Sequence, residues 1–120
     1  MEQDEFIRLV AERAHVTEEQ ARALTRATML TLGERITGGQ ARDLADALPP
    51  EIAPPLIMPQ EMAQKFDLAE FVRRVSERAG VDETTARDGV RAVFMTLRDA
   101  IPGKEFQDAM DQLPNEFQEI

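Results

Sequence analysis

Residues 5–14 read EFIRLVAERA, and residues 70–79 read EFVRRVSERA. These two stretches belong to a longer internal repeat, because residues 5–52 align with residues 70–117 without a gap at a constant offset of 65. The alignment contains 22 identities in 48 pairs. A repeat of this period predicts a structural unit that is built twice along the chain.

Each copy of the repeat carries the pattern of an amphipathic helix three times. Apolar residues recur at spacings of three and four, which places them on one face of a helix. In the first copy the three faces are formed by Phe6, Ile7, Val10 and Ala14, by Ala21, Thr28, Met29, Leu32 and Ile36, and by Ala41, Leu44 and Leu48. In the second copy they are formed by Leu68, Phe71, Val72, Val75 and Ala79, by Ala86, Val90, Val93, Phe94, Leu97 and Ile101, and by Phe106, Met110 and Leu113. We therefore predict an all-α protein, a tandem repeat of two three-helix units packed as one pseudo-twofold helical bundle.

Residues that commonly begin helices precede these faces. Thr17 is followed three residues later by Gln20, which is the pattern of a capping box. Asp67 and Glu70 form the same pattern in the second copy, and Asp82 stands at an N-cap position. These residues predict where three of the helices begin.

The chain is expected to form a single domain over residues 1–120. We place repeat one at about 4–52, a linker at about 53–66, and repeat two at about 67–120. The linker contains the apolar residues Leu56, Ile57, Met58, Met62 and Phe66. Because a solvated linker would be polar, we expect this one to pack against the bundle, with a helical turn around Gln60–Gln64.

Composition narrows the classes of function. The 120 residues carry a net charge of −9, and there is no cysteine, which excludes disulfides and thiolate metal sites. An acidic surface repels phosphate backbones and anionic membranes. The sequence has no apolar run long enough for a membrane span and no secretory leader. We therefore expect a cytoplasmic protein.

Val10–Arg26 and Val75–Arg91 resemble a helix-turn-helix and the helical start of HU-type DNA-bending proteins. The chain has no basic arm, however, and only two of its 14 basic residues are lysines. The local pattern is one that any tight helical hairpin needs. Nucleic acid is therefore an unlikely partner.

The residues that could take part in catalysis or bind a metal have structural interpretations that are simpler. His15 is the only histidine, and its repeat partner is Gly80 at the end of a helix, which favours a cap in left-handed conformation over a general base. Two aspartate pairs recur at a spacing of three: Asp43 with Asp46, and Asp108 with Asp111. Calcium takes six to eight oxygen ligands, and no loop near these pairs supplies them. We expect no enzyme activity, no catalytic residue, no metal and no cofactor.

A recurring pair of arginines allows two interpretations. The residues are Arg22 and Arg26 in the first copy, and Arg87 and Arg91 in the second. Guanidinium groups suit carboxylates and phosphates, so the four could bind a small anion at the seam between the repeats. Alternatively, they could pair with Asp43, Asp46, Asp108 and Asp111 and hold each third helix to its second.

Several stretches together resemble a known family. They are EF followed by VAER from Val10, LGERI-x-GG from Leu32, L-x3-LP from Leu44, KFDL-x-EF-x-RRV from Lys65, RAV from Arg91, and LP-x-EF from Leu113. The sequence is similar to a bacterial family catalogued as domain of unknown function 2267, over nearly the whole chain. The resemblance implies a small, soluble, all-helical tandem-repeat protein, and it implies no activity and no catalytic residues.

The expected function is that of a non-enzymatic protein-interaction or regulatory module. We expect its partner to be a protein bound through the linker residues Leu56, Ile57 and Met58, without a membrane. The alternative is binding of a small anionic ligand by the recurring arginines. The oligomeric state is left open, because a swap of halves across the linker would preserve every contact.

Overall fold

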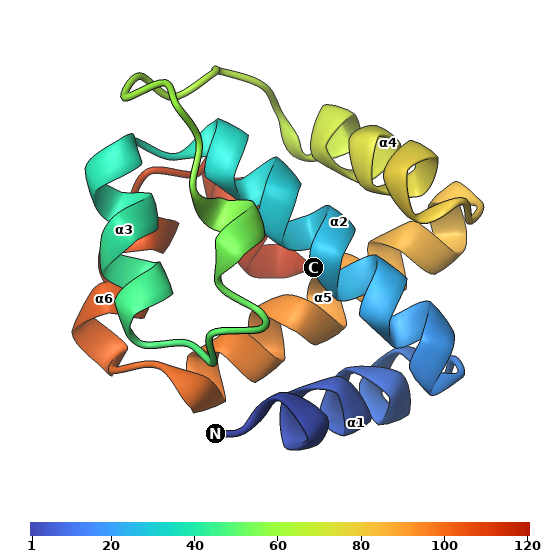
Figure 1. Ribbon diagram of the computed structural model, residues 1–120. Coiled ribbons are helices and arrows are strands. Elements are labelled where there is room, and N and C mark those ends of the chain that lie inside the picture. The colour runs from blue at the N-terminus through green and yellow to red at the C-terminus, as the bar shows by residue number, and fades with distance from the viewer.

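The computed structural model describes residues 1–120 and contains six α-helices and two short 3-10 helices (Figure 1). The α-helices are α1 (Gln3–Ala14), α2 (Glu18–Arg35), α3 (Gly38–Asp46), α4 (Leu68–Ala79), α5 (Glu83–Ala100) and α6 (Gly103–Met110). The 3-10 helices are η1 (Pro54–Leu56) and η2 (Asn115–Glu119). The all-α prediction is confirmed. None of the helices is long and apolar enough to cross a membrane.

The predicted N-caps begin the predicted helices. Thr17 and Gln20 form a complete capping box at the start of α2. The side chain of Asp67 accepts a hydrogen bond from the Glu70 amide, and Asp82 caps α5 in the same way. The Glu70 carboxylate does not complete a box with Asp67, because it receives hydrogen bonds from arginines of its own helix instead.

His15 ends α1 in the left-handed conformation, with φ of 58°. Its repeat partner Gly80 ends α4 with φ of 69°. In both places the amide of this residue bonds to a carbonyl of the last helical turn. The prediction that His15 is a helix cap is confirmed.

The longest helices, α2 and α5, pack against each other at the centre of the molecule (Figure 1). Helix α1 packs on α2 and also on α5, which belongs to the other repeat. Helix α4 packs on α5 and also on α2, and α3 packs against α6. Each repeat therefore contributes its first helix to the other repeat, and one cluster of 31 buried apolar residues runs through both.

The second repeat has more aromatic residues in its core than the first. Phe71 makes edge-to-face contacts with Phe94 and Phe117, with ring centroids 5.9 and 5.4 Å away. The repeat partners of these three residues are Phe6, Met29 and Ile52, and all three are buried. Phenylalanine is therefore shared at one of the three aligned positions, and the other two differ between the repeats.

Two glycines permit close contacts that a side chain would block. A Cβ at Gly89 would lie 2.6 Å from the side chain of Leu24, the residue at the same position of the first repeat. A Cβ at Gly33 would lie 2.4 Å from the carbonyl oxygen of Leu56 in the linker. These glycines let α5 approach α2, and let the linker lie directly on α2.

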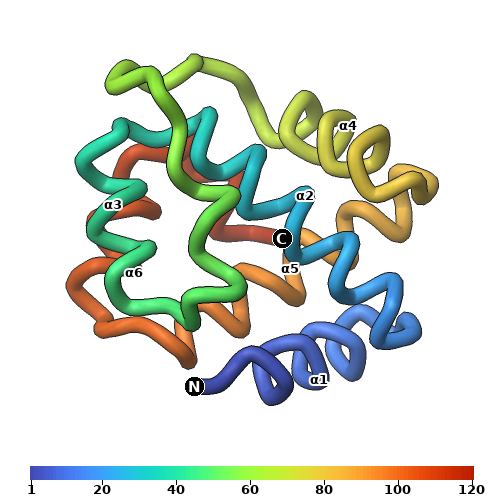
Figure 2. The backbone as a smooth tube through the Cα atoms, in the orientation of Figure 1, coloured from blue at the N-terminus to red at the C-terminus, as the bar shows by residue number.

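The linker packs against the bundle, as predicted, and Leu56 is fully buried. Figure 2 shows its path from α3 across α2 to α4, and η1 contacts both α2 and α3. The prediction of a helical turn around Gln60–Gln64 is wrong, because the only helical turn of the linker is η1.

The backbone of the segment after η1 bonds to the first repeat instead of to itself. The Glu61 carbonyl accepts a hydrogen bond from the Gly38 amide, and the Gln64 amide donates to the Glu34 carbonyl. The Glu61 side chain also forms two hydrogen bonds with Arg42. These bridges replace the local hydrogen bonds that a helical turn would need.

Candidate functional site

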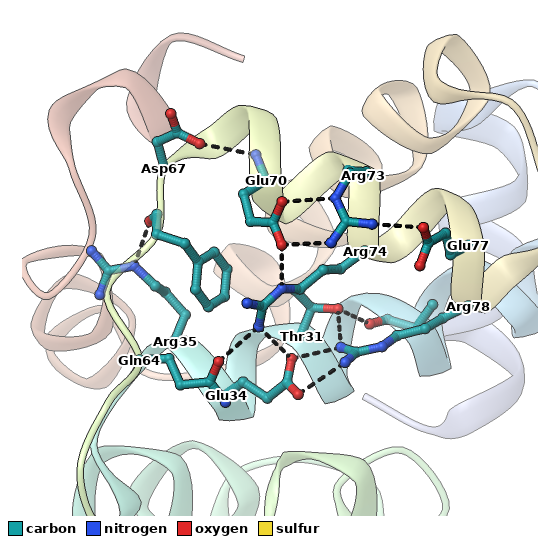
Figure 3. Close-up of polar contacts among 12 residues, drawn as sticks. Thr31, Glu34, Arg35, Gln64, Asp67, Glu70, Arg73, Arg74, Glu77 and Arg78 are labelled. Carbon is teal, nitrogen blue, oxygen red and sulfur yellow. Dashed lines mark hydrogen bonds and ion pairs between the residues drawn. The ribbon is translucent and has the colours of Figure 1, made fainter.

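A network of arginines and carboxylates joins α2 to α4 (Figure 3). Glu34 accepts hydrogen bonds of 2.7 and 2.9 Å from Arg78 and one of 3.2 Å from Arg74. Glu70 accepts hydrogen bonds from Arg73 and Arg74 within α4. The Glu34 side chain is only 16% exposed, so these pairs are partly shielded from solvent.

The linker contributes to the same network. The guanidinium of Arg74 lies 3.9 Å from the ring centroid of Phe66, and it also donates a hydrogen bond to Gln64. The buried Arg35 donates its Nε hydrogen to the Phe66 carbonyl oxygen over 2.9 Å. The network therefore holds the end of the linker against α2 and α4.

The carboxylates of the network have shifted pKa values. Burial by itself raises the pKa of Glu34, but the hydrogen bonds and charges of Arg78 and Arg74 outweigh burial and lower it. Hydrogen bonds from Arg73 and then Arg74 lower the pKa of Glu70 to about 2. Both groups are thus held ionised at neutral pH, with their charge already paired.

The first repeat makes the equivalent contacts to α5. Arg78 donates to the Thr31 hydroxyl over 2.9 Å as well as to Glu34. Its repeat partner Arg13 donates to Thr96 over 3.0 Å and to Asp99 over 2.7 Å. Each arginine thus fastens the first helix of one repeat to the second helix of the other, which is a structural role.

This pair of contacts was missed by sequence reasoning, although its signal was present. Arg13 recurs as Arg78, Thr31 recurs as Thr96, and the charge of Glu34 recurs as Asp99. The repeat showed that the residues share a role. It did not show that the partners of each arginine lie in the other copy.

The structure does not bring the four predicted arginines together. Arg22 and Arg26 line one hollow, Arg91 lines a separate groove, and Arg87 lines neither. All four side chains are exposed. The prediction of a shared site at the seam therefore lacks the required proximity.

The alternative pairing of these arginines with the recurring aspartates is wrong. The ion pairs include none between the two sets, and Arg22 instead lies 3.9 Å from Asp4. Asp108 pairs with Lys104, and Asp111 accepts a hydrogen bond from Gln107. The second aspartate pair thus has partners from α6, and Asp43 and Asp46 form no ion pair.

The first hollow, termed the α1–α2 hollow, has a volume of about 290 Å³. It is lined by Gln3, Ile7, Arg22, Thr25, Arg26, Glu51, Ile52, Pro54 and Pro55. Thr25 is 3% exposed, and its hydroxyl makes no hydrogen bond. The charges of the lining are mixed, because Glu51 stands among the arginines.

The second depression, termed the α5–α6 groove, has a volume of about 410 Å³. Its apolar lining is formed by Phe94, Met95, Phe106, Met110, Phe117 and Ile120. Its polar lining is formed by Arg91, Arg98, Gln107 and Gln118, with Gly103. Neither arginine of the groove forms an ion pair within the protein. The groove thus combines an apolar surface with two arginines that form no ion pair.

The predicted partner residues of the linker differ in accessibility. Leu56 is fully buried, so its side chain serves as an anchor for the linker and is not open to a partner. Ile57 is 48% exposed, and Met58 is partly exposed. Met62, a linker residue outside the predicted partner site, is 85% exposed.

The titratable side chains form no cluster suited to a metal ion, by the criterion of three or more histidine, cysteine, aspartate or glutamate groups. His15 is exposed at the end of α1, where it serves as the left-handed cap of the helix.

Comparison with known proteins identifies the family. No curated protein matches this sequence. A family model described as "Uncharacterized conserved protein (DUF2267)" matches residues 3–120, which is nearly the whole chain. The resemblance inferred from the sequence is thereby confirmed, and the chain belongs to the DUF2267 family.

Proposed function

We propose that this protein is a non-enzymatic protein-interaction module that acts in the cytoplasm of a bacterium and binds its partner in the α5–α6 groove. The partner is a peptide segment of another protein that carries aliphatic side chains beside a carboxylate. The observation that supports this proposal is the composition of the groove, with its apolar lining and its two arginines free of ion pairs.

Charge makes this groove distinctive. The whole chain carries a net charge of −9, so an accessible pair of unpaired arginines beside an apolar surface is a local exception. Apolar burial supplies affinity, and complementary charge supplies orientation and a faster approach. In a segment with an aliphatic side chain and an acidic neighbour, the first would contact the apolar lining and the second the arginines.

We further propose that the two repeats are related by a pseudo-twofold axis between α2 and α5. The contacts of α1 with α5 correspond to those of α4 with α2, and the contacts of Arg13 correspond to those of Arg78. Helices α3 and α6, which are repeat partners, pack against each other. This arrangement gives the α5–α6 groove a counterpart in the first repeat.

Photo-cross-linking in the bacterial host tests the proposed docking site. A photoreactive residue at the exposed Gln118 is expected to yield a discrete adduct, which disappears when Arg91 and Arg98 are replaced by alanine. The control is the same residue at Ile57 in the linker. Adducts from position 57 alone, or adducts from position 118 that survive both substitutions, would overturn the proposal.

A second candidate function is the binding of a small anion in the α1–α2 hollow. It is favoured by the unpaired hydroxyl of Thr25 beside Arg22 and Arg26. A thermal-shift screen of phosphorylated and carboxylate metabolites is expected to find a stabilising ligand whose effect is lost in Arg26→Gln. Silence across the screen would contradict this candidate.

A further inference from the structure

We infer that the α1–α2 hollow binds a small amino acid with an aliphatic side chain. The inference rests on the second candidate function, the binding of a small anion in this hollow. It adds the chemistry of the ligand, because the lining offers arginines for a carboxylate, a glutamate for an ammonium group, and an apolar wall for the side chain.

Two arginines of the hollow are available to a carboxylate. Arg22 and Arg26 stand four residues apart on one face of α2, so both can reach the same ligand. Arg26 forms no ion pair, and Arg22 only approaches the exposed Asp4 at 3.9 Å. A guanidinium group presents several donors in one plane, which suits the two oxygens of a carboxylate.

Thr25 adds a further donor, and it distinguishes the first repeat from the second. Thr25 is 3% exposed, and its hydroxyl has no hydrogen-bond partner. The second repeat holds the buried Val90 at this position, a side chain of similar shape without a polar atom. A buried hydroxyl without a partner costs free energy, and a carboxylate oxygen of a ligand would supply the missing partner.

Glu51 indicates that the ligand also carries a positive charge. Its repeat partner Glu116 accepts a hydrogen bond of 2.6 Å from the Leu68 amide at the start of α4. Glu51 lines the hollow together with Gln3, the repeat partner of Leu68, but it forms no equivalent hydrogen bond and no ion pair. Its carboxylate would repel a simple anion, whereas it would attract the ammonium group of an amino acid.

The remaining wall of the hollow is apolar and suits a short side chain. It is formed by Ile7, Ile52, Pro54 and Pro55. The repeat partner of Ile52 is the larger Phe117, so the first repeat fills this position with a smaller side chain. The volume of about 290 Å³ lies close to the lower end of the range of about 300–1,000 Å³ found for small-molecule sites, which fits a ligand the size of an amino acid.

Calorimetric titration of the full-length protein with leucine and two analogues tests the chemistry of the ligand. Leucine is expected to bind. Isocaproate, which lacks the ammonium group, should bind about threefold more weakly, and leucinamide, which lacks the carboxylate, about tenfold more weakly. Glu51→Gln should lower the affinity for leucine and raise the affinity for isocaproate, because the variant removes both an attraction and a repulsion. Changes of the same sign for the two compounds would overturn the inference.

A matched pair of variants tests the site. Thr25→Val should bind leucine about tenfold more weakly, yet remain at least as stable as the wild type in urea, because the second repeat already holds valine at this position. Arg87→Gln should bind leucine as the wild type does, because Arg87 is the repeat partner of Arg22 but lies outside the hollow. Unchanged affinity in Thr25→Val, or an equal loss in both variants, would overturn the inference.

Isoleucine-methyl NMR locates the bound amino acid. Ile7 and Ile52 line the α1–α2 hollow, whereas Ile120 lines the α5–α6 groove. Unlabelled leucine should shift the methyl signals of Ile7 and Ile52 and leave the signal of Ile120 in place. A shift of Ile120 alone would place the leucine in the α5–α6 groove and overturn the inference.

The remaining outcomes separate this inference from the candidate function on which it rests. If isocaproate binds as tightly as leucine, shifts Ile7 and Ile52, and loses its affinity in Arg26→Gln, the ligand is a simple anion. The inference is then overturned, and the anion site stands. If neither leucine nor any anion of the thermal-shift screen binds, both are wrong.

Discussion

His15 occupies a backbone conformation that its repeat partner fills with glycine. The left-handed region costs a residue with a Cβ roughly 1–2 kcal/mol, whereas glycine loses roughly 0.5–1 kcal/mol more chain entropy on folding. We therefore expect His15→Gly to stabilise the protein by about 0.5–1 kcal/mol in urea denaturation. The converse change, Gly80→Ala, should destabilise it by about 1 kcal/mol. A clear loss of stability in His15→Gly would show that the imidazole makes an essential contact.

The lowered pKa of Glu70 predicts how the stability of the protein depends on pH. Its pKa is about 2 in the folded protein, against an ordinary value of 4.5. Between these values the unfolded chain binds a proton at this position and the folded chain does not, so protonation favours unfolding. The contribution of Glu70 is therefore complete above about pH 4.5 and is lost as the pH falls toward 2.

The measurement is the urea midpoint at several values between about pH 5 and pH 2.5. The wild type should lose stability more steeply than Glu70→Gln over this interval. The matched control is Glu5→Gln, because Glu5 is the repeat partner of Glu70 but is exposed and forms no ion pair. An unchanged slope in Glu70→Gln would contradict the assignment.

At the scale of residues, sequence reasoning predicted local roles well and distant partners poorly. The N-caps Thr17 and Asp82 and the left-handed cap His15 depend on a few neighbouring residues, and all were predicted correctly. The contacts of Arg13 and Arg78 span 83 and 47 positions to their threonines. No local pattern encodes contacts across such separations.

Among the elements, the contact between η1 and α2 depends most on a single glycine. A Cβ at Gly33 would lie 2.4 Å from the Leu56 carbonyl oxygen, and backbone atoms cannot move aside as a flexible side chain can. Gly33→Ala should therefore destabilise the protein by about 1–3 kcal/mol. Thermal or urea denaturation measures this loss.

Gly103→Ala is the control for Gly33→Ala. Gly103 begins α6, and a Cβ there would meet no atom within 4 Å. Alanine at this position should be neutral or stabilising by up to about 1 kcal/mol, because it reduces the entropy of the unfolded chain. If the two alanine variants were equally stable, the linker would not lie on α2 as closely as described.

The elements themselves were largely predictable, because the apolar period of three and four is strong in every helix. The linker was not. Its apolar residues predicted correctly that it packs, but its only helical turn lies at Pro54–Leu56 and not around Gln60–Gln64. The difference arises from backbone hydrogen bonds to Gly38 and Glu34, which are distant in sequence.

At the scale of the whole molecule, the repeats are interlocked. An apolar face shows that a helix is buried, but it does not show which of two similar surfaces buries it. Helix α1 has nearly equivalent partners in α2 and α5, and the structure uses both. The sequence therefore predicted two three-helix units, while the packing of each first helix on the second helices of both repeats required coordinates.

The arginines of the candidate site were only partly predictable from the repeat. The recurring arginines drew attention to Arg91, which lines the α5–α6 groove, but the other groove arginine is Arg98, which does not recur. The informative position was a mismatch of the repeat, Gly33 against Arg98. The role of Arg98 follows from its place in the groove beside Arg91, which only the fold reveals.

Methionine NMR can show whether ligands dock in the α5–α6 groove. The six methionines are Met1, Met29, Met58, Met62, Met95 and Met110. Met95 and Met110 line the groove, Met58 and Met62 belong to the linker, and Met29 is buried in the first repeat. With ¹³C-methyl-methionine in the full-length protein, an unlabelled peptide that carries leucine beside glutamate should shift the signals of Met95 and Met110 and leave the others in place. Shifts of Met58 and Met62, with Met95 and Met110 unchanged, would contradict the account.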